Sequence, residues 1–206
     1  MTTDLHAHWE NVYRSKAERD VSWFQERAEI SLELIAATGI GPNGAVIDVG
    51  GGASRLVDAL LDAGFTDLTV LDLSESALAA AKARLGARSE KVRWIAADVT
   101  AWDGPQTCDL WHDRAAFHFL TDPNDRAAYA ARVLRAVRPG GHVIVGTFAL
   151  DGPERCSGLP VVRHDARSVG AALGPSFKLV DSRNHAHRTP TGAIQRFQFS
   201  RFRSTR

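Results

Sequence analysis

The chain is poor in the features that stabilise secreted proteins and anchor membrane proteins. Its 206 residues include only two cysteines, Cys108 and Cys156, which excludes a framework of several disulfides. No apolar run reaches membrane-spanning length, and the first residues, MTTDLHAHWENVYRSK, lack the apolar segment of an export signal. We therefore expect a cytoplasmic protein with no membrane partner.

An excess of charge of one sign is also missing. The 25 basic and 24 acidic residues leave a net charge of +1. Proteins that bind nucleic acid usually carry a basic excess, and here the only concentrated basic stretch is the C-terminal FSRFRSTR, which is typical of a solvated tail. Nucleic acid is therefore not expected as a partner.

What the chain does have is a regular alternation of apolar strand-like runs and helical patterns. Strands are predicted at 45–50, 67–74, 91–99, 108–113 and 142–149, with helices at 54–64, 75–86 and 124–137, the last ended by RPGG. Helices between consecutive strands imply parallel pairing through right-handed crossovers, with both faces of the sheet covered.

The two ends of the chain depart from this alternation. After a loop at 151–160 and a helix at 165–173, two strand-like segments flank the turn sequence RTPTG, which predicts a hairpin and an antiparallel last strand. Residues 1–40 look helical and could cover the carboxyl edge of the sheet as a lid. We therefore expect one α/β domain over 1–206, a Rossmann-like seven-stranded sheet that is mostly parallel, with helices on both faces.

The glycine-rich turn in VIDVGGGASRLV bears on the ligand. A dinucleotide loop needs a third glycine where this chain has Arg55, although Gly50 and Gly52 fit the spacing. Asp48 would place a carboxylate close to a pyrophosphate, which is electrostatically unfavourable. No Gly-Lys-Ser/Thr follows either, so the sequence favours a ligand without phosphates.

Carboxylates at successive strand ends indicate what that ligand carries. Asp72, 22 residues after Gly50, can accept two hydrogen bonds from ribose hydroxyls. Asp98, followed by Val99, can meet the amino edge of an adenine, and Asp48 can favour an ammonium group. S-adenosylmethionine combines these groups and has no phosphate.

These motifs resemble those of the class I S-adenosylmethionine-dependent methyltransferases. DVGGGAS resembles the first motif of that family, LDLS its acidic ribose motif and ADVT its adenine motif, while RPGG before a strand and a terminal antiparallel hairpin are also typical. The resemblance implies a cofactor-binding half at 41–150, and a substrate loop and C-terminal hairpin at 151–206.

Two further stretches, HWENVY…VSWF and DLWHDRAAFHFL, look like the subgroup that contains elongation-factor and citrate-synthase lysine methyltransferases. That subgroup has EKG or DKG where this chain has DRA, and the fork of an arginine is not equivalent to a lysine. Cofactor-binding residues expected from the motifs and the resemblance together are Trp9, Tyr13, Trp23, Asp48, Gly50, Gly52, Ser54, Asp72, Leu73, Asp98, Val99 and Arg114.

The stretch WHDRAAFHFL, residues 111–120, lies where a methyl group would project. Asp113 and His112 are candidates for orienting or deprotonating a nucleophile, a role needed only where the nucleophile carries a proton. His118 either faces the pocket as a third catalytic candidate or packs within a short helix. His185 and His187 share a strand face but have no evident third ligand, so no metal is predicted.

The leading hypothesis is methyl transfer to a small-molecule acceptor, which could be a thiol, an amine or a hydroxyl. A protein lysine methyltransferase and a cofactor-binding module without catalysis are the alternatives. Nucleic-acid methylation is disfavoured because the fourth strand lacks the Asn/Asp-Pro-Pro-aromatic sequence typical of it. The chain could be a monomer or a homodimer.

Overall fold

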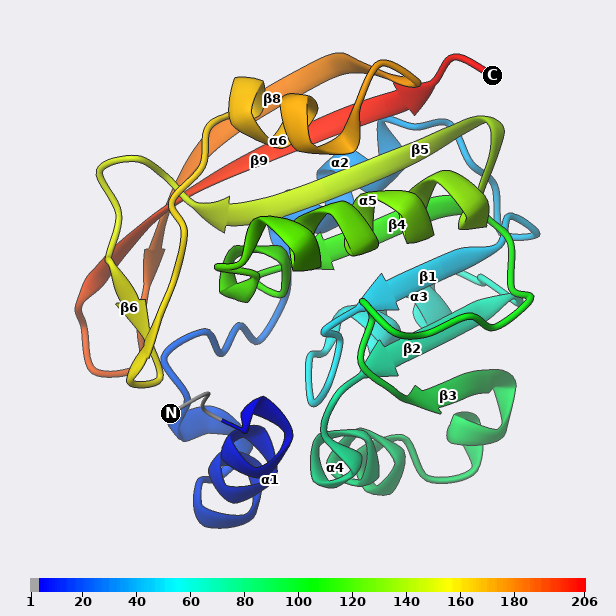
Figure 1. Ribbon diagram of the computed structural model, residues 1–206. Coiled ribbons are helices and arrows are strands. Elements are labelled where there is room, and N and C mark those ends of the chain that lie inside the picture. Colours follow the sequence, from blue (N-terminus) through cyan, green and yellow to red (C-terminus); the bar gives the residue numbers. More distant parts are fainter. Residues whose placement is uncertain (1–3) are drawn as a thin grey trace.

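One seven-stranded sheet runs through the molecule, in the order β3-β2-β1-β4-β5-β9-β8 (Figure 1). The computed structural model describes residues 4–206, so the first three residues of the expected lid lie outside the described part. The strands are β1 (Val46–Val49), β2 (Leu68–Asp72), β3 (Val92–Ala96), β4 (Cys108–Arg114), β5 (Val137–Phe148), β8 (Phe177–Arg188) and β9 (Ile194–Ser204).

The pairing confirms the predicted fold class. β1 lies parallel to β2 on one side and to β4 on the other, and β4 lies parallel to β5. β9 is antiparallel to both β5 and β8, between which it lies. The strand order reverses at β1, and ligands bind at such a switch point in open sheets of this kind.

Helices cover both faces of the sheet (Figure 1). Leu34, Leu56 and Leu78 belong to one buried cluster, and Tyr129 and Val169 belong to the cluster on the other face. The helices are α1 (Leu5–Ser15), α2 (Glu29–Ala36), α3 (Leu56–Asp62), α4 (Glu75–Leu85), α5 (Pro123–Ala136) and α6 (Ala166–Leu173), with 3-10 turns at Glu18–Asp20, Gly86–Lys91 and Phe117–Phe119. Ser74 caps α4, where its hydroxyl accepts a bond from the Ala77 N–H at 3.1 Å.

Two segments differ from the sequence-based expectation. RPGG does not simply end a helix, because β5 already begins at Val137 and includes these residues. The register of β5 against β4 shifts between Cys108 and Leu110, and Gly140 adopts φ 73° inside this bulge. The expected loop at 151–160 contains a small ribbon of β6 (Arg155–Cys156) and β7 (Leu159–Pro160).

The helices within residues 4–206 are all too short or too polar to span a bilayer.

Candidate active site

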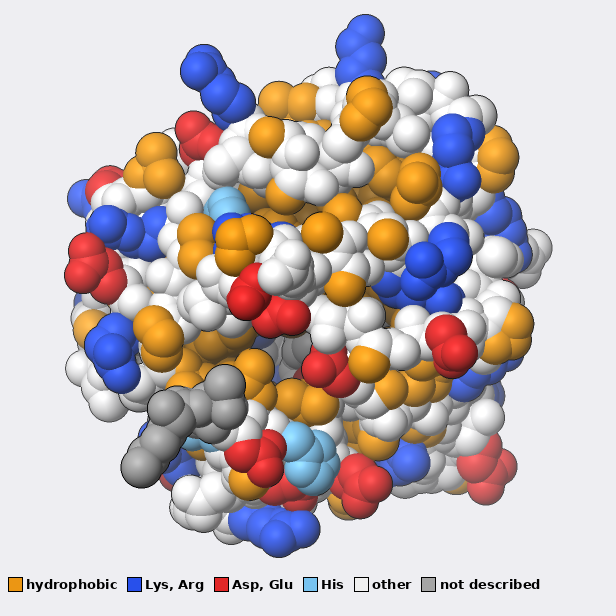
Figure 2. All heavy atoms as spheres, viewed as in Figure 1, with side chains coloured by type: hydrophobic (Ala, Val, Ile, Leu, Met, Phe, Trp, Pro, Cys, Tyr) orange, Lys and Arg blue, Asp and Glu red, His pale blue; other side chains and the backbone are white. Residues whose placement is uncertain are grey.

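A pocket opens at the carboxyl ends of β1 to β4. In the space-filling view a hollow on this face is bordered by hydrophobic and acidic side chains (Figure 2). Most of the residues predicted to bind a cofactor line this pocket, namely Trp9, Tyr13, Trp23, Gly50, Asp72, Leu73, Asp98, Val99 and Arg114. The predicted edge of the sheet is thus the edge that carries the pocket.

The three glycines after β1 keep the floor of this region open. Gly50 and Gly52 have φ values of 63° and 38°, which disfavour a side chain. A Cβ on Gly52 would lie 2.8 Å from Asp72 Oδ2, and one on Gly51 would lie 2.5 Å from Asp48 Oδ2. Gly51 was not among the predicted residues, but its lack of a side chain makes room for that carboxylate.

Asp72 ends β2 at the pocket and is buried. Its Oδ1 accepts a bond from the Ser74 N–H at 2.8 Å. Burial raises the pKa of Asp72 to about 7, and the nearby charge of Asp48 adds to this, although backbone N–H groups oppose it. A ligand that donates hydrogen bonds to this carboxylate would relieve the cost of burying its charge.

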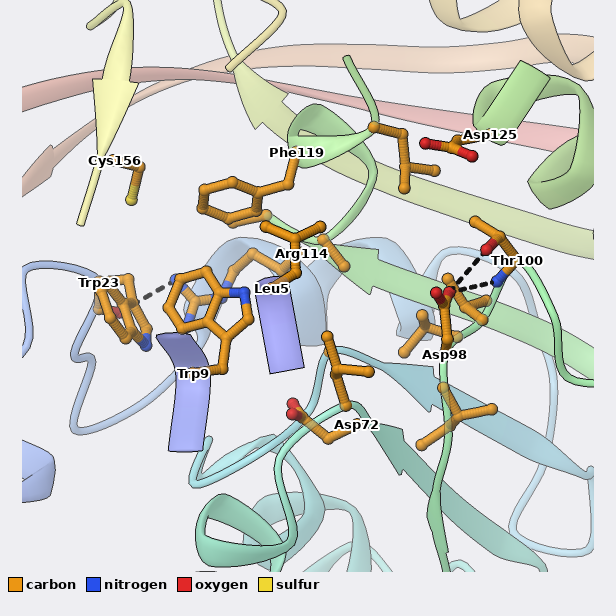
Figure 3. A pocket seen from close by; sticks show the side chains of 18 of the residues that line it. Leu5, Trp9, Trp23, Asp72, Asp98, Thr100, Arg114, Phe119, Asp125 and Cys156 are labelled. Atoms are coloured by element: carbon orange, nitrogen blue, oxygen red, sulfur yellow. Dashed lines mark hydrogen bonds between the residues drawn. The ribbon is translucent and has the colours of Figure 1, made fainter. Parts of the chain in front are cut away.

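The other end of the pocket carries a second, exposed carboxylate. Asp98 follows β3 and accepts bonds from the N–H and the hydroxyl of Thr100, at 2.8 and 2.7 Å. Figure 3 shows Asp98 and Thr100 at one end with Asp125, while Trp23, Phe119 and Cys156 lie at the opposite end. Asp72 lies between the two groups, and Trp9 lies beside Trp23 and Phe119.

The N-terminal segment supplies an aromatic cover over the pocket. Trp9 on α1 lies with its ring centroid 5.6 Å from that of Trp23 and 5.0 Å from that of Phe119, both edge-on. Tyr13, one turn further along α1, is 6.2 Å from Trp23 by the same measure. Aromatic rings in this arrangement form a rigid wall that can attract a cation.

Glu10 fastens α1 to the start of α4. Its carboxylate accepts bonds from the Ser74 hydroxyl at 2.7 Å and from the N–H and hydroxyl of Ser76 at 2.9 and 2.6 Å. These bonds, above all the one from the Ser76 side chain, lower the pKa of Glu10 to about 2. Because α4 follows Asp72 by only a few residues, Glu10 sets where the lid lies relative to the pocket.

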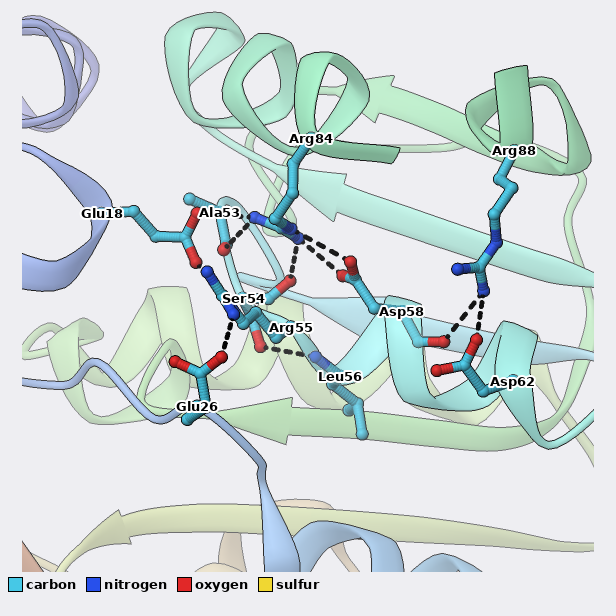
Figure 4. Close-up of polar contacts among 10 residues, drawn as sticks. All are labelled: Glu18, Glu26, Ala53, Ser54, Arg55, Leu56, Asp58, Asp62, Arg84 and Arg88. Atoms are coloured by element: carbon cyan, nitrogen blue, oxygen red, sulfur yellow. Dashed lines mark hydrogen bonds and ion pairs between the residues drawn. The ribbon is translucent and has the colours of Figure 1, made fainter. Parts of the chain in front are cut away.

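A cluster of ion pairs fastens the lid a second time (Figure 4). Glu18 lies 2.7 Å from Arg55 Nε through Oε1 and 2.9 Å from Arg84 Nη1 through Oε2. Arg84 also donates to the backbone carbonyls of Ala53 and Ser54, each at 2.9 Å. Arg55, which breaks the dinucleotide spacing, therefore helps to tie the glycine turn to the lid.

Arg114 ends β4 and lines both the main pocket and a smaller polar one beside it. Its Nη1 donates to the carbonyl of Trp23 at 3.1 Å, and within residues 4–206 it forms no ion pair with a carboxylate. Burial lowers the pKa of Arg114, but a guanidinium remains charged in proteins. The smaller pocket is lined by Tyr13, Trp23, Asp48, Gly50, Gly51, Ser54, His112 and Arg114.

Asp48 and Ser54 thus lie at the smaller pocket, and each makes an internal contact. Asp48 is buried and its Oδ1 lies 2.7 Å from His112 Nδ1. Ser54 accepts a bond from the Leu56 N–H at 3.2 Å, and α3 begins at Leu56 rather than at residue 54.

His112 and Asp113, two of the expected catalytic residues, both make internal contacts. His112 Nε2 lies 2.9 Å from Ser31 Oγ, so both of its ring nitrogens are engaged. Asp113 is fully buried and accepts bonds from the Ala116 N–H at 2.9 Å and the Tyr129 hydroxyl at 2.8 Å. Burial raises its pKa to about 6, but Asp113 does not border the pocket and instead holds the turn after β4.

His118 packs within the short helix, which was the structural alternative. Its Nδ1 accepts a bond from the Phe148 N–H at 3.2 Å, and its ring lies against Phe119 and Phe148. Burial lowers the pKa of His118 to about 3, so the ring is neutral. His187 is likewise internal, because its Nε2 lies 2.8 Å from the carbonyl of Ser22.

Several residues at the pocket were not foreseen. Phe119, Cys156, Gln195 and Phe197 come from three segments far apart in the sequence, and only the folded chain brings them together. Ala115 also borders the pocket and has φ 70°, a conformation that favours glycine. The sequence did contain a signal for this positive φ, because Ala115 stands where the subgroup motif DKG has a glycine.

Comparisons with known proteins agree with this geometry. A family model described as a methyltransferase domain matches residues 46–141. The chain is 26% identical over 145 residues to an eEF1A lysine and N-terminal methyltransferase homolog from Drosophila melanogaster, a match that covers 66% of this chain but only 21% of that protein.

Two solved structures share the architecture. One is the 1,6-didemethyltoxoflavin-N1-methyltransferase of Burkholderia thailandensis with bound 1,6-didemethyltoxoflavin and S-adenosylhomocysteine, at 25% identity and a TM-score of 0.68, covering 98% of this chain and 84% of that one. The other is the N-methyltransferase NodS of Bradyrhizobium japonicum WM9 in complex with S-adenosylhomocysteine, at 16% identity and a TM-score of 0.74, covering 96% and 98%.

Proposed function

We propose that this chain is a class I S-adenosylmethionine-dependent methyltransferase that methylates a small-molecule acceptor. The observation that carries the proposal is the aromatic cover over the pocket, which Trp9, Tyr13 and Trp23 form together with Phe119. A covered pocket suits a molecule that is enclosed during the reaction, because enclosure aligns the nucleophile and excludes water.

The residues at the pocket fit the cofactor. Asp72 is a buried carboxylate at the end of β2 and lines the pocket, where it would accept hydrogen bonds from the ribose hydroxyls. Asp98 and Val99 would border the adenine, and the glycine turn leaves room for the chain between ribose and amino acid. In the smaller pocket, Arg114 would meet the carboxylate of the cofactor and Asp48 its ammonium group.

When bound, S-adenosylmethionine supplies an activated methyl group on a sulfonium. The protein then has to hold the acceptor in line with that methyl group. Trp9 and Trp23 would enclose the positive sulfonium through cation–π attraction. Phe119 and Phe197 would provide the apolar walls against which an acceptor packs.

Calorimetry with S-adenosylhomocysteine, followed by an assay of its release, tests the proposal. The purified protein should bind this product, should not bind NAD, and should release it when given S-adenosylmethionine with members of a panel of thiols, amines and phenols. Labelling only of lysate proteins, with no small molecule methylated, would overturn the choice of acceptor.

The second candidate is methylation of a protein lysine. It is favoured by the similarity to the Drosophila melanogaster protein named above, although the chain spans only 21% of that protein's length. Under this reading, radiolabelled cofactor should mark a discrete lysate protein band, and acid hydrolysis of that band should yield methyl-lysine.

A further inference from the structure

The end of the pocket opposite Asp98 and Asp125 forms an apolar chamber within it. Figure 3 shows Trp23, Phe119 and Cys156 gathered there, away from Asp98 and Asp125. Phe197 adds a further wall, and the ring of Phe148 packs behind it with centroids 4.8 Å apart. A molecule with an apolar or aromatic body fits such walls.

Gln195 adds a polar atom to this chamber. It lines the pocket, and its Oε1 is buried with no hydrogen-bond partner among residues 4–206. Gln195 pairs across the hairpin with His187, which in turn contacts the carbonyl of Ser22, next to Trp23. Gln195 therefore belongs to the Trp23 end of the pocket.

The charge at this end is positive. Arg114 reaches the carbonyl of Trp23 here, and the carboxylates that line the described part of the pocket, Asp72, Asp98 and Asp125, lie toward its middle and its other end. Asp48 shares the smaller pocket with Arg114. With Arg114 paired to the cofactor's carboxylate and Asp48 to its ammonium group, the sulfonium charge has no further carboxylate beside it at this end. An incoming ammonium group would meet like charge and lose its hydration.

No side chain at this end of the described pocket is available as a base. His112 and Asp113 are committed to internal contacts, and the ring of His118 lies outside the pocket. Burial raises the pKa of Cys156 to about 11, so its thiol stays protonated. An acceptor must therefore give up its own proton without help from the protein.

Resting on the proposed function, we propose that this chamber takes an apolar or aromatic thiol, which reacts as its thiolate, and rejects aliphatic amines. A thiolate forms at neutral pH far more readily than an alkoxide, and its negative charge is attracted to the positive end of the pocket. The thiol proton passes to solvent. The thiolate sulfur then bonds to the methyl carbon while the bond from that carbon to the sulfonium sulfur breaks, and the electron pair of that bond stays on the departing sulfur.

Benzyl mercaptan and benzylamine are a matched pair of probes, since they share one shape and differ in the reacting atom. With S-adenosylmethionine and the 206-residue protein, kcat/KM should favour the thiol by at least about 100-fold. Calorimetry on the protein loaded with S-adenosylhomocysteine should rank the two probes in the same order, with the thiol at least about tenfold tighter.

A substitution in the chamber should shift the preference. Gln195→Glu places a carboxylate beside the acceptor, so the thiol-to-amine ratio should fall by at least about tenfold. Ile194→Glu is the control, because Ile194 is 49% exposed and does not line the pocket, so the same added charge should leave the ratio unchanged.

The outcomes separate this inference from the proposed function. Equal or better use of benzylamine by a protein that binds S-adenosylhomocysteine overturns the thiol assignment and leaves a small-molecule methyltransferase. If neither probe turns over, the calorimetric ranking decides, and a preference for the amine, or none, overturns the assignment. A protein that fails to bind S-adenosylhomocysteine overturns both.

Discussion

Asp72 and Asp113 are both buried carboxylates at strand ends, but their surroundings give them different tasks. The carboxylate of Asp113 accepts hydrogen bonds from backbone N–H groups in the turn after β4 and from the hydroxyl of Tyr129. Asp72 accepts from the Ser74 N–H and borders the pocket. A buried acceptor that faces a pocket is completed by a ligand, whereas one already saturated by the protein is structural.

Removal of the Asp72 carboxylate should weaken cofactor binding. Asp72→Ala deprives the ribose hydroxyls of their acceptors, and we expect the affinity for S-adenosylhomocysteine to fall by about 1–3 kcal/mol. Calorimetry on the two proteins measures this. Asp67→Ala, just before the opposite end of β2 and outside the pocket, should bind like the parent protein. Unchanged affinity of Asp72→Ala would exclude the ribose role.

Cofactor affinity should also depend on pH through Asp72. Its pKa is raised to about 7 in the free protein, so below that pH much of the carboxyl is protonated. Ribose hydroxyls donate to the carboxylate and so lower its pKa, which means that binding releases a proton. Affinity for S-adenosylhomocysteine should therefore rise with pH, by up to about tenfold per unit below the pKa. In Asp72→Ala this dependence should disappear.

The sequence predicted the pocket residues that directly follow the strands better than those at the end of the pocket near Trp23. Asp72, Asp98 and the glycines follow strands directly, so their place at the pocket follows from chain direction alone. The role of His118 could not be deduced in this way, because only the packing of the chain decides that its ring turns to Phe148. The place of Gln195 at the pocket could not be predicted for a related reason, because a hairpin brings it there from a distant part of the chain.

Among the elements, α1 is joined to the start of α4 by one buried carboxylate, that of Glu10. Glu10 receives three hydrogen bonds from Ser74 and Ser76, while α1 carries Trp9 and Tyr13 over the pocket. Hydrogen bonds to a charged carboxylate therefore hold this helix in place, in addition to its apolar contacts.

Glu10→Gln should loosen the lid. The amide accepts hydrogen bonds more weakly than the carboxylate, and we expect a loss of about 1–3 kcal/mol in the free energy of unfolding together with weaker binding of S-adenosylhomocysteine. Urea unfolding followed by tryptophan fluorescence measures the first effect. Asn11→Ala, an exposed position on the same helix, should change neither.

Acid should also lower the free energy of unfolding of the parent protein, because it protonates Glu10. The pKa of Glu10 is lowered from 4.5 to about 2 by folding, so its contribution is complete above the unfolded value and is lost as the pH falls through that interval. Urea unfolding at a series of pH values measures this loss in the free energy of unfolding. Glu10→Gln has no carboxyl at this position, so its free energy of unfolding should fall less between pH 4.5 and about 2 than that of the parent protein. An equal fall in both proteins would show that Glu10 is not responsible.

Elements were predictable where one periodic pattern dominated. The helices and the seven strands follow from apolar spacing, and the terminal hairpin follows from its turn sequence. The predicted start of β5 is too late, because RPGG is typical of the end of a helix. Proline and glycine also occur in strand bulges, and Gly140 shows that such a bulge forms here. The β6–β7 ribbon was missed because its two-residue strands are too short to show a period.

At the scale of the whole molecule, lid, glycine turn and sheet edge surround one pocket, so a ligand there contacts segments from both ends of the chain. S-adenosylhomocysteine at 100 times its dissociation constant should stabilise the protein by about 2.7 kcal/mol. For a chain of this size that corresponds to a rise in Tm of about 5–11 °C, which differential scanning calorimetry detects. NAD at the same concentration is the control, and an equal rise with NAD would contradict the cofactor assignment.

Glu18 has a consequence for the speed of the enzyme. It holds Arg55 and Arg84 at once, so the lid cannot swing clear of the pocket without separating both pairs in the same event. In many enzymes the departure of product, rather than chemistry, limits turnover. We expect rapid-mixing experiments to show a burst of methylated product, followed by a slower steady rate. Added salt should raise that steady rate, and Glu18→Gln should make it less sensitive to salt, with Glu26 still paired to Arg55.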